Sequence, residues 1–223
     1  MLAKHKDRAA LILERFERSN VDRIVAAVPE YRRSSFYPQQ EATIYRVIQT
    51  SYELLEPREK DLLARFAIFP EDTFIPIGAV ELLGSVTGLD ALDFDQSLED
   101  LSDAALLTYT RDDSSPARSG ISLHDIQRDF VRRLGGDARA NHAAVVQAFC
   151  ARHNGRLYAA EDEGGSDYLR RFMVHHLIGA GMAEDLFELL IDPHWIGHRL
   201  NAKDPVLELV GDYDRALVTD WGA

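Results

Sequence analysis

Cysteine is nearly absent from this chain of 223 residues, and its scarcity excludes a fold held together by disulfide bonds. Cys150 is the only cysteine, so no disulfide can form within the chain. No apolar run approaches the roughly 18 residues that a membrane span requires. The positive charges in segment 1–7 are not followed by the apolar stretch of a secretory signal peptide. We therefore expect a protein that works in the cytoplasm.

Positive charge is also in short supply. Lysines and arginines number 25 against 37 aspartates and glutamates, which gives a formal net charge of −12. Proteins that bind phosphate backbones or anionic membranes need the opposite balance. Hydrophobic residues make up 46% and charged residues 28%, as in globular proteins of one to three small domains. We expect neither nucleic acid nor membrane among the partners.

Two motifs that would indicate enzymatic activity are missing. Gly78, Gly84 and Gly88 are not followed by Lys-Ser or Lys-Thr, so the chain has no G-x-x-x-x-G-K-[ST] loop to hold nucleotide phosphates. It also lacks the G-x-S-x-G turn of many serine hydrolases. Cys150 lies in a helical stretch and is expected to fill space in the core rather than act as a nucleophile. The chain is not expected to be an enzyme by itself.

Helical spacing of apolar residues dominates both ends of the chain. We interpret 1–55 as a partial first helical domain and 136–223 as a second helical domain. The stripes of the first are Val21, Ile24, Val25 and Val28, and Ile44, Val47, Ile48 and Leu55. The stripes of the second are Leu169, Phe172, Met173, His176, Leu177 and Ala180, and Val206, Leu209, Val210, Tyr213 and Leu217.

The middle segment, 56–135, has a different order of elements: three helices and then a β-hairpin, which is the order of a winged helix. The expected fold is therefore mainly α, with a winged helix and its small β-hairpin between helical domains. A turn-rich connection, 111–120, forms the wing. The predicted elements are helices starting near Pro57 and Pro76, a helix through Phe94, Leu98 and Leu101, and β-prone runs at 106–110 and 121–123.

Several short motifs follow one another in a fixed order along the chain. They are 48–55 (an SYxxL pattern), 66–72 (FPED), 98–107 (L…L…LL), 123–125 (MHD, here Leu-His-Asp), and 174–177 with 192–196 near the end. This order resembles the NB-ARC (STAND) signalling ATPases, and most of all the winged-helix and helical-domain arm of apoptotic protease-activating factors. The resemblance covers nearly all of the chain from about residue 20. The family's P-loop and Walker B carboxylates are missing here.

The resemblance implies a function. Such a chain is the regulatory arm of a nucleotide-switch protein: it contacts ADP held by a separate P-loop domain and controls autoinhibition and oligomerisation. The chain alone would hold no cofactor, and ADP or ATP would be bound together with the missing P-loop domain. The other implied partner is a C-terminal sensor, often a repeat array in this family.

His124 and Asp125 are the candidate site residues. By resemblance to the MHD motif, the imidazole of His124 contacts the β-phosphate of ADP in the intact parent protein. Imidazole can donate a hydrogen bond to phosphate, and it titrates near neutrality. Asp125 is expected to cap the following helix and orient its backbone. The alternative is that His124 only satisfies a strand end or caps that helix.

The other histidines suggest no metal site. His194 and His198 could share one helix face, but Trp195 stands where a zincin has its glutamate, and no third ligand is evident. His175 and His176 cannot both point the same way on a helix. His176 falls on the apolar stripe, so a buried and hydrogen-bonded histidine is expected there.

Two other functions stay open: a winged-helix transcription regulator that binds DNA, and a free-standing helical adaptor for protein interactions. The third helix of a winged helix usually enters the major groove. Here 93–103 contains five carboxylates and no lysine or arginine, so phosphates would repel it. Arginines near the wing and the last helix equally suit docking on an acidic protein face. They are Arg111, Arg118, Arg128, Arg132 and Arg133.

Overall fold

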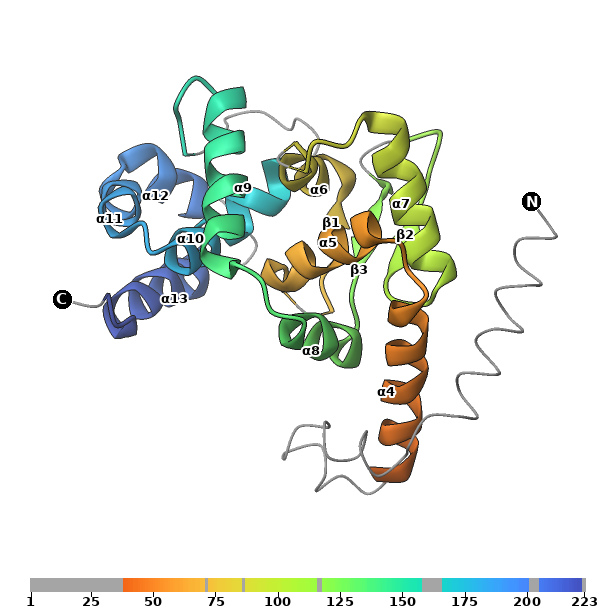
Figure 1. Ribbon diagram of the computed structural model, residues 1–223. Coiled ribbons are helices and arrows are strands. Elements are labelled where there is room, and N and C mark those ends of the chain that lie inside the picture. Colours follow the sequence, from red (N-terminus) through yellow and green to blue (C-terminus); the bar gives the residue numbers. More distant parts are fainter. Residues whose placement is uncertain are drawn as a thin grey trace.

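The computed structural model describes residues 38–70, 72–85, 87–115, 118–157, 166–200 and 205–221, with the backbone only at 38–43, 166, 167, 198 and 205. The predicted stripe from Val21 to Val28 lies outside these residues. The described chain is mainly helical with one small sheet, which confirms the expected fold class (Figure 1). No described helix is both long and apolar enough to cross a membrane. The helices are α4 (Pro38–Glu53), α5 (Pro57–Arg65), the 3-10 helix η1 (Phe66–Ile68), α6 (Ile77–Gly84), α7 (Ala91–Asp103), α8 (Asp125–Arg133), α9 (Ala138–Arg152), α10 (Ser166–Ala180), α11 (Ala183–Ile191), α12 (Pro193–Leu200) and α13 (Pro205–Val218).

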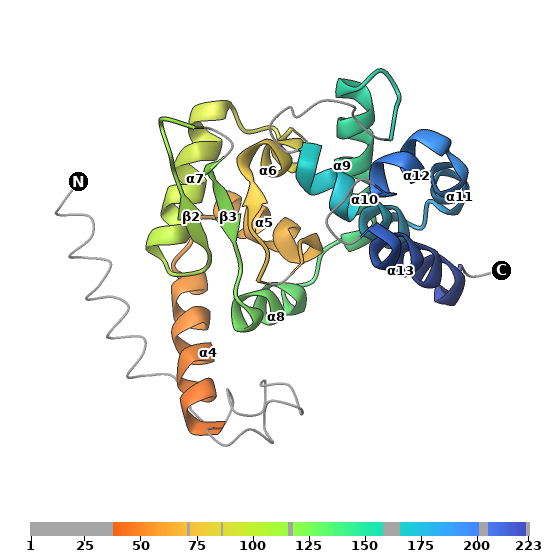
Figure 2. The same cartoon turned by 180° about the vertical axis from the view of Figure 1, so that it is seen from behind.

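The middle of the chain contains the three predicted helices, α5, α6 and α7, beside the sheet (Figure 2). Pro57 occupies the first turn of α5, where the backbone N–H of Glu56 donates to the Glu59 carboxylate at 3.0 Å. The N-cap Asp90 of α7 accepts a hydrogen bond from the backbone N–H of Asp93 at 2.9 Å. Local capping therefore fixes where these helices begin. The inner residues of α7 are buried as predicted: Phe94, Leu98 and Leu101.

The sheet contains one strand more than the predicted hairpin. Its strands are β1 (Ile75–Pro76), β2 (Thr108–Thr110) and β3 (Gly120–Ser122), with β3 in the centre and antiparallel to both neighbours. Two residues are too few to show the alternating pattern by which a strand is predicted, so β1 was not expected. Gly120 allows the strands to approach, because an added Cβ would lie 2.3 Å from the carbonyl oxygen of Ile75.

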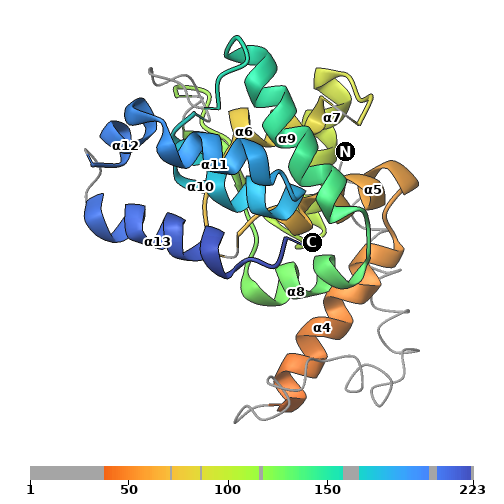
Figure 3. The ribbon, with the colours of Figure 1, turned by 90° about the vertical axis from the view of Figure 1, so that its left-hand side faces the viewer.

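The carboxyl-terminal part is helical, and α9 and α10 form its most extensive contact (Figure 3). The stripe predicted in α10 is buried, apart from the half-buried Phe172. Both α9 and α10 also pack against α6 of the middle segment, and α4 packs against α8. One apolar core therefore extends from Tyr45 to Ala216. The division into domains at 55/56 and 135/136 stays a prediction.

The apolar face predicted for α4 is partly wrong. Ile44 and Val47 are 47% and 37% exposed, whereas Tyr45 is buried next to Ile48. The Tyr45 ring packs edge-on against Phe130 of α8, with 5.5 Å between ring centres. An aromatic ring buries more surface than an aliphatic side chain, so the contact with α8 decides which face of α4 turns inward.

The apolar face predicted for α13 is wrong for most of its residues, because the buried side of this helix contains a charge. Val206, Val210 and Leu217 are exposed, while Asp212 is fully buried. Asp212 accepts a hydrogen bond from Nε of Arg199 in α12, at 2.8 Å. A buried guanidinium needs a carboxylate partner, and this requirement sets the rotation of α13.

Candidate functional site

The candidate site lies where two of the motifs meet, the turn after η1 and the start of α8. The backbone N–H of Asp72 donates to the carbonyl oxygen of Leu123 at 3.0 Å. A carboxylate oxygen of Asp72 lies 3.4 Å from Nδ1 of His124, which is 52 residues away in the sequence. Asp72 has a φ of 49°, in the left-handed region that aspartate tolerates better than most residues. The two motifs form one continuous surface.

His124 has a fixed backbone and an exposed ring. Its backbone N–H donates to Oε1 of Gln127 at 2.9 Å, and Nε2 of Gln127 in turn donates to the carbonyl oxygen of Ala105 at 2.9 Å. The side chain of His124 is 72% exposed. The backbone of His124 is therefore fixed, and its imidazole is accessible to a molecule outside the chain.

The N-cap of α8 is His124 and not Asp125, so His124 occupies the capping position that its alternative interpretation predicted, and its contact with a phosphate stays a prediction. His124 has the extended backbone of an N-cap, φ −68° and ψ 159°, and Asp125 is the first residue of the helix. The Asp125 carboxylate accepts a hydrogen bond from the backbone N–H of Ile126 at 2.7 Å. A negative charge in the first turn stabilises a helix through its dipole, so Asp125 supports the start of α8 without capping it.

The Asp72 contact decides what the His124 ring can donate. A carboxylate only accepts hydrogen bonds, so a neutral ring that donates from Nδ1 to Asp72 has no proton on Nε2. Nε2 can then donate to a phosphate only if the ring is protonated or the Asp72 contact opens. That contact is long, at 3.4 Å, and is easily exchanged. Asp72 and Asp125 also repel a bare anion, so this surface needs a second component to hold phosphate.

The turn after η1 is also joined to two helices through its carbonyl oxygens. Nε of Arg128 in α8 donates to the carbonyl oxygen of Phe69 at 2.8 Å. Nε2 of His175 in α10 donates to the carbonyl oxygen of Ile68 at 2.9 Å. These two bonds connect the turn both to α8 and to α10.

A group of three histidines lies behind this turn. His142 of α9 meets His176 of α10 with 2.9 Å between their Nδ1 atoms, and the Tyr168 hydroxyl lies 3.1 Å from Nε2 of His176. His176 is fully buried, which confirms the prediction of a hydrogen-bonded core histidine. Burial, followed by the nearby charges of His175 and Arg132, lowers the pKa of His142 to about 3. Burial also lowers the pKa of His175 and of His176, so all three rings are neutral at pH 7.

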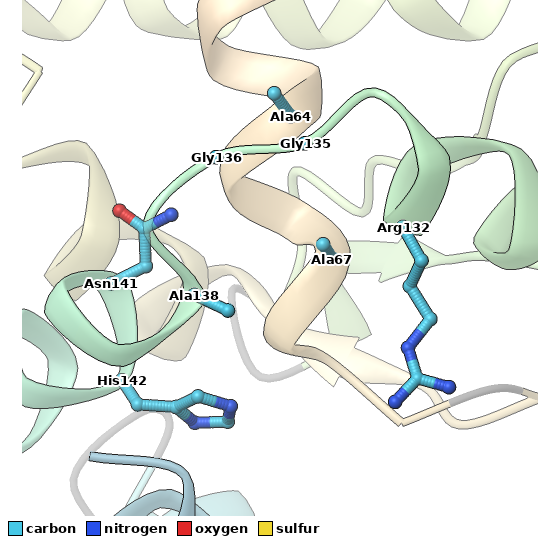
Figure 4. A pocket seen from close by; sticks show the side chains of 8 residues that line it. All are labelled: Ala64, Ala67, Arg132, Gly135, Gly136, Ala138, Asn141 and His142. Carbon is cyan, nitrogen blue, oxygen red and sulfur yellow. The ribbon is translucent and has the colours of Figure 1, made fainter.

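A pocket of about 160 Å³ opens beside His142 (Figure 4). Its walls come from α5, η1, the end of α8, the Gly135–Gly136 turn and the start of α9. Gly135 and Gly136 have φ values of 79° and 131°, so the turn between the two predicted domains uses backbone conformations that favour glycine. The sequence did not predict the pocket or the position of His142 in its wall. α9 meets the other segments of the wall only when the chain folds, so no local pattern indicates these contacts.

The arginines expected to gather in one basic cluster are divided. Arg111 of the wing contacts the carboxylates of Asp95, Glu99 and Asp113 at 2.7, 3.3 and 3.1 Å. Two of these carboxylates belong to α7, so the acidic third helix neutralises its own wing. Arg128 donates to the main chain, as described above. This arrangement does not favour docking through a single basic face.

The remaining candidate residues lie apart from this surface. His194 is exposed next to the fully buried Trp195, and the side chain of His198 lies outside the described atoms. Cys150 is half-buried against the apolar core, and burial raises the pKa of its thiol. A thiol in such a place is a weak nucleophile.

Comparisons with known proteins agree with the expected resemblance. Residues 139–217 match the family model of the APAF-1 helical domain, which here spans α9 to α13. The chain is 22% identical over 214 residues to apoptotic protease-activating factor 1 of Danio rerio. The alignment covers 96% of this chain and 16% of that relative, so the chain spans a small part of its length. Residues 139–217 are therefore similar to the APAF-1 helical domain, in a chain that is similar to apoptotic protease-activating factor 1 along nearly all of its length.

Proposed function

We propose that the chain is the regulatory arm of an Apaf-1-like nucleotide switch, in which the winged helix contacts ADP held by a separate P-loop domain. The observation that supports this best is the 72% exposed ring of His124 at the N-cap of α8, on the surface where two motifs meet. The chain has no P-loop of its own, so we propose neither ATP hydrolysis nor nucleotide binding by the chain alone. ADP or ATP would be its cofactor only together with that domain, in the cytoplasm.

In this proposal His124 closes the nucleotide site from outside. The P-loop domain supplies the backbone donors and the lysine that offset the phosphate charge. His124 then adds one donor to the β-phosphate, either as an imidazolium or after its contact with Asp72 opens. Asp125 and the Gln127 bridge hold the backbone from which the ring projects. The contact stabilises the closed, autoinhibited form.

Release of the contact would free the arm to move and permit oligomerisation. The turn after η1 supports this coupling, because Arg128 and His175 tie it to α8 and to α10. A shift at His124 would move the turn after η1 through the bond between Asp72 and Leu123. The bond from His175 to Ile68 would then transmit the shift to α10. A sensor that follows α13 in the parent would shift the same equilibrium between closed and open forms, through its contact with the second helical segment.

The DNA-binding alternative has less support. Helix α7 would enter the major groove, but it contains the half-exposed Asp93, Asp95 and Glu99, and Asp95 and Glu99 already bind Arg111 of the wing. DNA binders gain affinity by neutralising phosphates, which this surface cannot do. Tight, salt-sensitive binding to duplex DNA would favour the regulator and would count against the arm.

The test combines the chain with the P-loop domain of its parent and measures ADP binding. The P-loop domain is titrated with ADP alone, with the wild-type chain, with His124→Ala and with His194→Ala. A hydrogen bond to a charged group contributes about 1.5–3 kcal/mol, so His124→Ala should weaken ADP binding by about 10- to 100-fold. His194→Ala removes another exposed histidine near a helix start and should change nothing. Wild-type affinity in the His124→Ala pair would overturn the proposal.

A further inference from the structure

Three imidazoles from two helices converge behind the turn after η1. One ring nitrogen each of His142, His175 and His176 lies within 4.8 Å of the other two. Among the described residues this is the one place where three side chains of metal-binding type come together. His142 and His176 are buried and His175 is half-buried. Although His175 and His176 point in different directions from α10, both face His142 because α9 crosses α10 there.

Hydrogen bonds to Ile68 and Tyr168 engage one nitrogen of His175 and one of His176, so the other nitrogen of each ring remains for a partner within the cluster. The carbonyl oxygen of Ile68 can only accept, so His175 has its proton on Nε2 and a lone pair on Nδ1. The Tyr168 hydroxyl holds Nε2 of His176, whose Nδ1 faces His142. Histidines that bind metals are usually held in this way, with the second nitrogen bonded to a carbonyl or another polar group.

The spacing between His142 and His176 suits a metal ion with little rearrangement. Their Nδ1 atoms share a proton at 2.9 Å. Two Zn–N bonds of about 2.0–2.1 Å at a tetrahedral angle place the nitrogens about 3.3–3.4 Å apart. The rings would separate by a few tenths of an ångström, and the shared proton would move to the other nitrogen of the same ring. No proton needs to leave the protein.

The surroundings provide both a rigid wall and a route of entry. An added Cβ on Gly179 would lie 2.4 Å from the His142 ring, so α10 fits closely against it. The pocket of about 160 Å³ leads from the surface to the His142 ring. His175 and His176 do not line it, so an ion or a water would reach the three nitrogens by passing the His142 ring. Burial keeps the rings neutral, which is the form that binds metals. Arg132 on the pocket wall opposes a cation, so we expect weaker binding than at a site with thiolate ligands.

We propose that His142, His175 and His176 form a site for Zn²⁺ or a similar borderline divalent ion, with water as the fourth ligand. Imidazole nitrogens suit such ions, and three histidines with an open fourth position are a known zinc arrangement. The ion would join α9 to α10. Through the bond from His175 to Ile68 it would also fix the turn that leads to Asp72 and His124.

The first test titrates the untagged chain with Co²⁺ and follows visible absorption, which is strong for four-coordinate Co²⁺ and weak for six-coordinate Co²⁺. Displacement by Zn²⁺ gives its affinity. We expect one equivalent to bind, with affinity reduced at least about 100-fold in His142→Gln and His175→Gln and about 10- to 100-fold in Tyr168→Phe. Glutamine preserves hydrogen bonding, and far-UV circular dichroism verifies folding. His194→Gln is the matched control and should bind like the wild type.

A second test needs no variant. Nitrogen-15 spectra of the histidine rings are recorded on the wild-type chain during addition of Zn²⁺. The proposal requires the signals of His142, His175 and His176 to shift together, up to one equivalent. Absence of a four-coordinate Co²⁺ spectrum in the wild type would overturn it. So would shifts confined to other histidines, or loss of binding in His194→Gln with retention in both ligand variants.

Discussion

The backbone N–H of Asp72 donates to the carbonyl oxygen of Leu123, and through this bond the turn after η1 is held against the start of α8. The same pairing places the Asp72 carboxylate 3.4 Å from the His124 ring. Two motifs that are separate in the sequence therefore act as one unit. Changes in either should alter the position of the exposed imidazole.

The left-handed backbone of Asp72 gives a first prediction. Alanine in this region costs about 1–2 kcal/mol more than glycine, which has no Cβ. Asp72→Ala and Asp72→Gly both remove the carboxylate, so the difference between them isolates the backbone. We expect Asp72→Ala to be less stable than Asp72→Gly by about 1 kcal/mol in urea denaturation, since an unfolded chain gains some entropy from glycine. Equal stabilities would mean that the turn adopts another conformation.

The close approach of β1 and β3 gives a second prediction. Gly120→Ala puts a Cβ against the carbonyl oxygen of Ile75, so the strands must separate, at a cost of about 1–3 kcal/mol. The matched control is Gly211→Ala in the middle of α13, where no atom lies within 4 Å of the new Cβ. Alanine favours a helix over glycine by about 0.5–1 kcal/mol, so this variant should be more stable. Glycine-to-alanine substitution is thus expected to lower the urea midpoint at position 120 and to raise it at position 211. If both variants shifted the midpoint in the same direction, the register of the sheet would be contradicted.

The ion pair between α12 and α13 gives a third prediction. Arg199 is 4% exposed and Asp212 is fully buried, with Nη2 of Arg199 2.7 Å from Oδ2 of Asp212. Removing one partner and leaving a buried charge typically costs about 3–5 kcal/mol. In Arg199→Met the Asp212 carboxylate keeps its contact with the half-exposed Arg215, at 2.6 Å, so this variant should destabilise the chain by an amount at or below the lower end of this range. The double variant Arg199→Met with Asp212→Leu should recover part of the loss, and chemical denaturation of all four proteins gives the coupling. A coupling of zero would exclude the pair as the determinant of the α13 rotation.

Cys150 gives a fourth prediction, on pH dependence. Burial raises the pKa of its thiol, so at any pH below that value the folded chain has less thiolate than the unfolded chain. Thiolate is the reactive form. At pH 8 the native chain should react with a disulfide reagent more slowly than the chain unfolded in urea. The reaction rate of the native chain should also keep rising with pH after the rate of the unfolded chain has reached its plateau. A rate equal to that of the unfolded chain would contradict the half-buried position.

Periodic patterns in the sequence predicted the elements that local rules determine. Pro57 indicated the first turn of a helix, and Phe94, Leu98 and Leu101 repeat at helical spacing, so α5 and α7 followed from neighbouring residues alone. The motif order also located His124 correctly at the junction of sheet and helix. The exposure of the His124 ring, in contrast, depends on the folded structure and could not be predicted from the motif.

What the sequence could not indicate depends on contacts between distant segments. β1 exists because Ile75 meets Ile121, and no pattern in two residues reveals such a pairing. His142 and His176 are 34 residues apart and meet only because α9 packs on α10. The rotation of α13 follows from Arg199, a residue outside that helix. In each case the structure depends on a partner residue that is distant in the sequence, and the spacing of apolar residues does not reveal that partner.

The most direct test of the proposed contact compares ADP with AMP, because AMP lacks the β-phosphate. The binding affinities of both nucleotides are measured for the parent's P-loop domain combined with the wild-type chain and with His124→Ala. A contact from His124 to the β-phosphate predicts that the variant weakens ADP binding by about 10- to 100-fold and leaves AMP binding unchanged. Equal effects on the two nucleotides, or no effect on either, would contradict it.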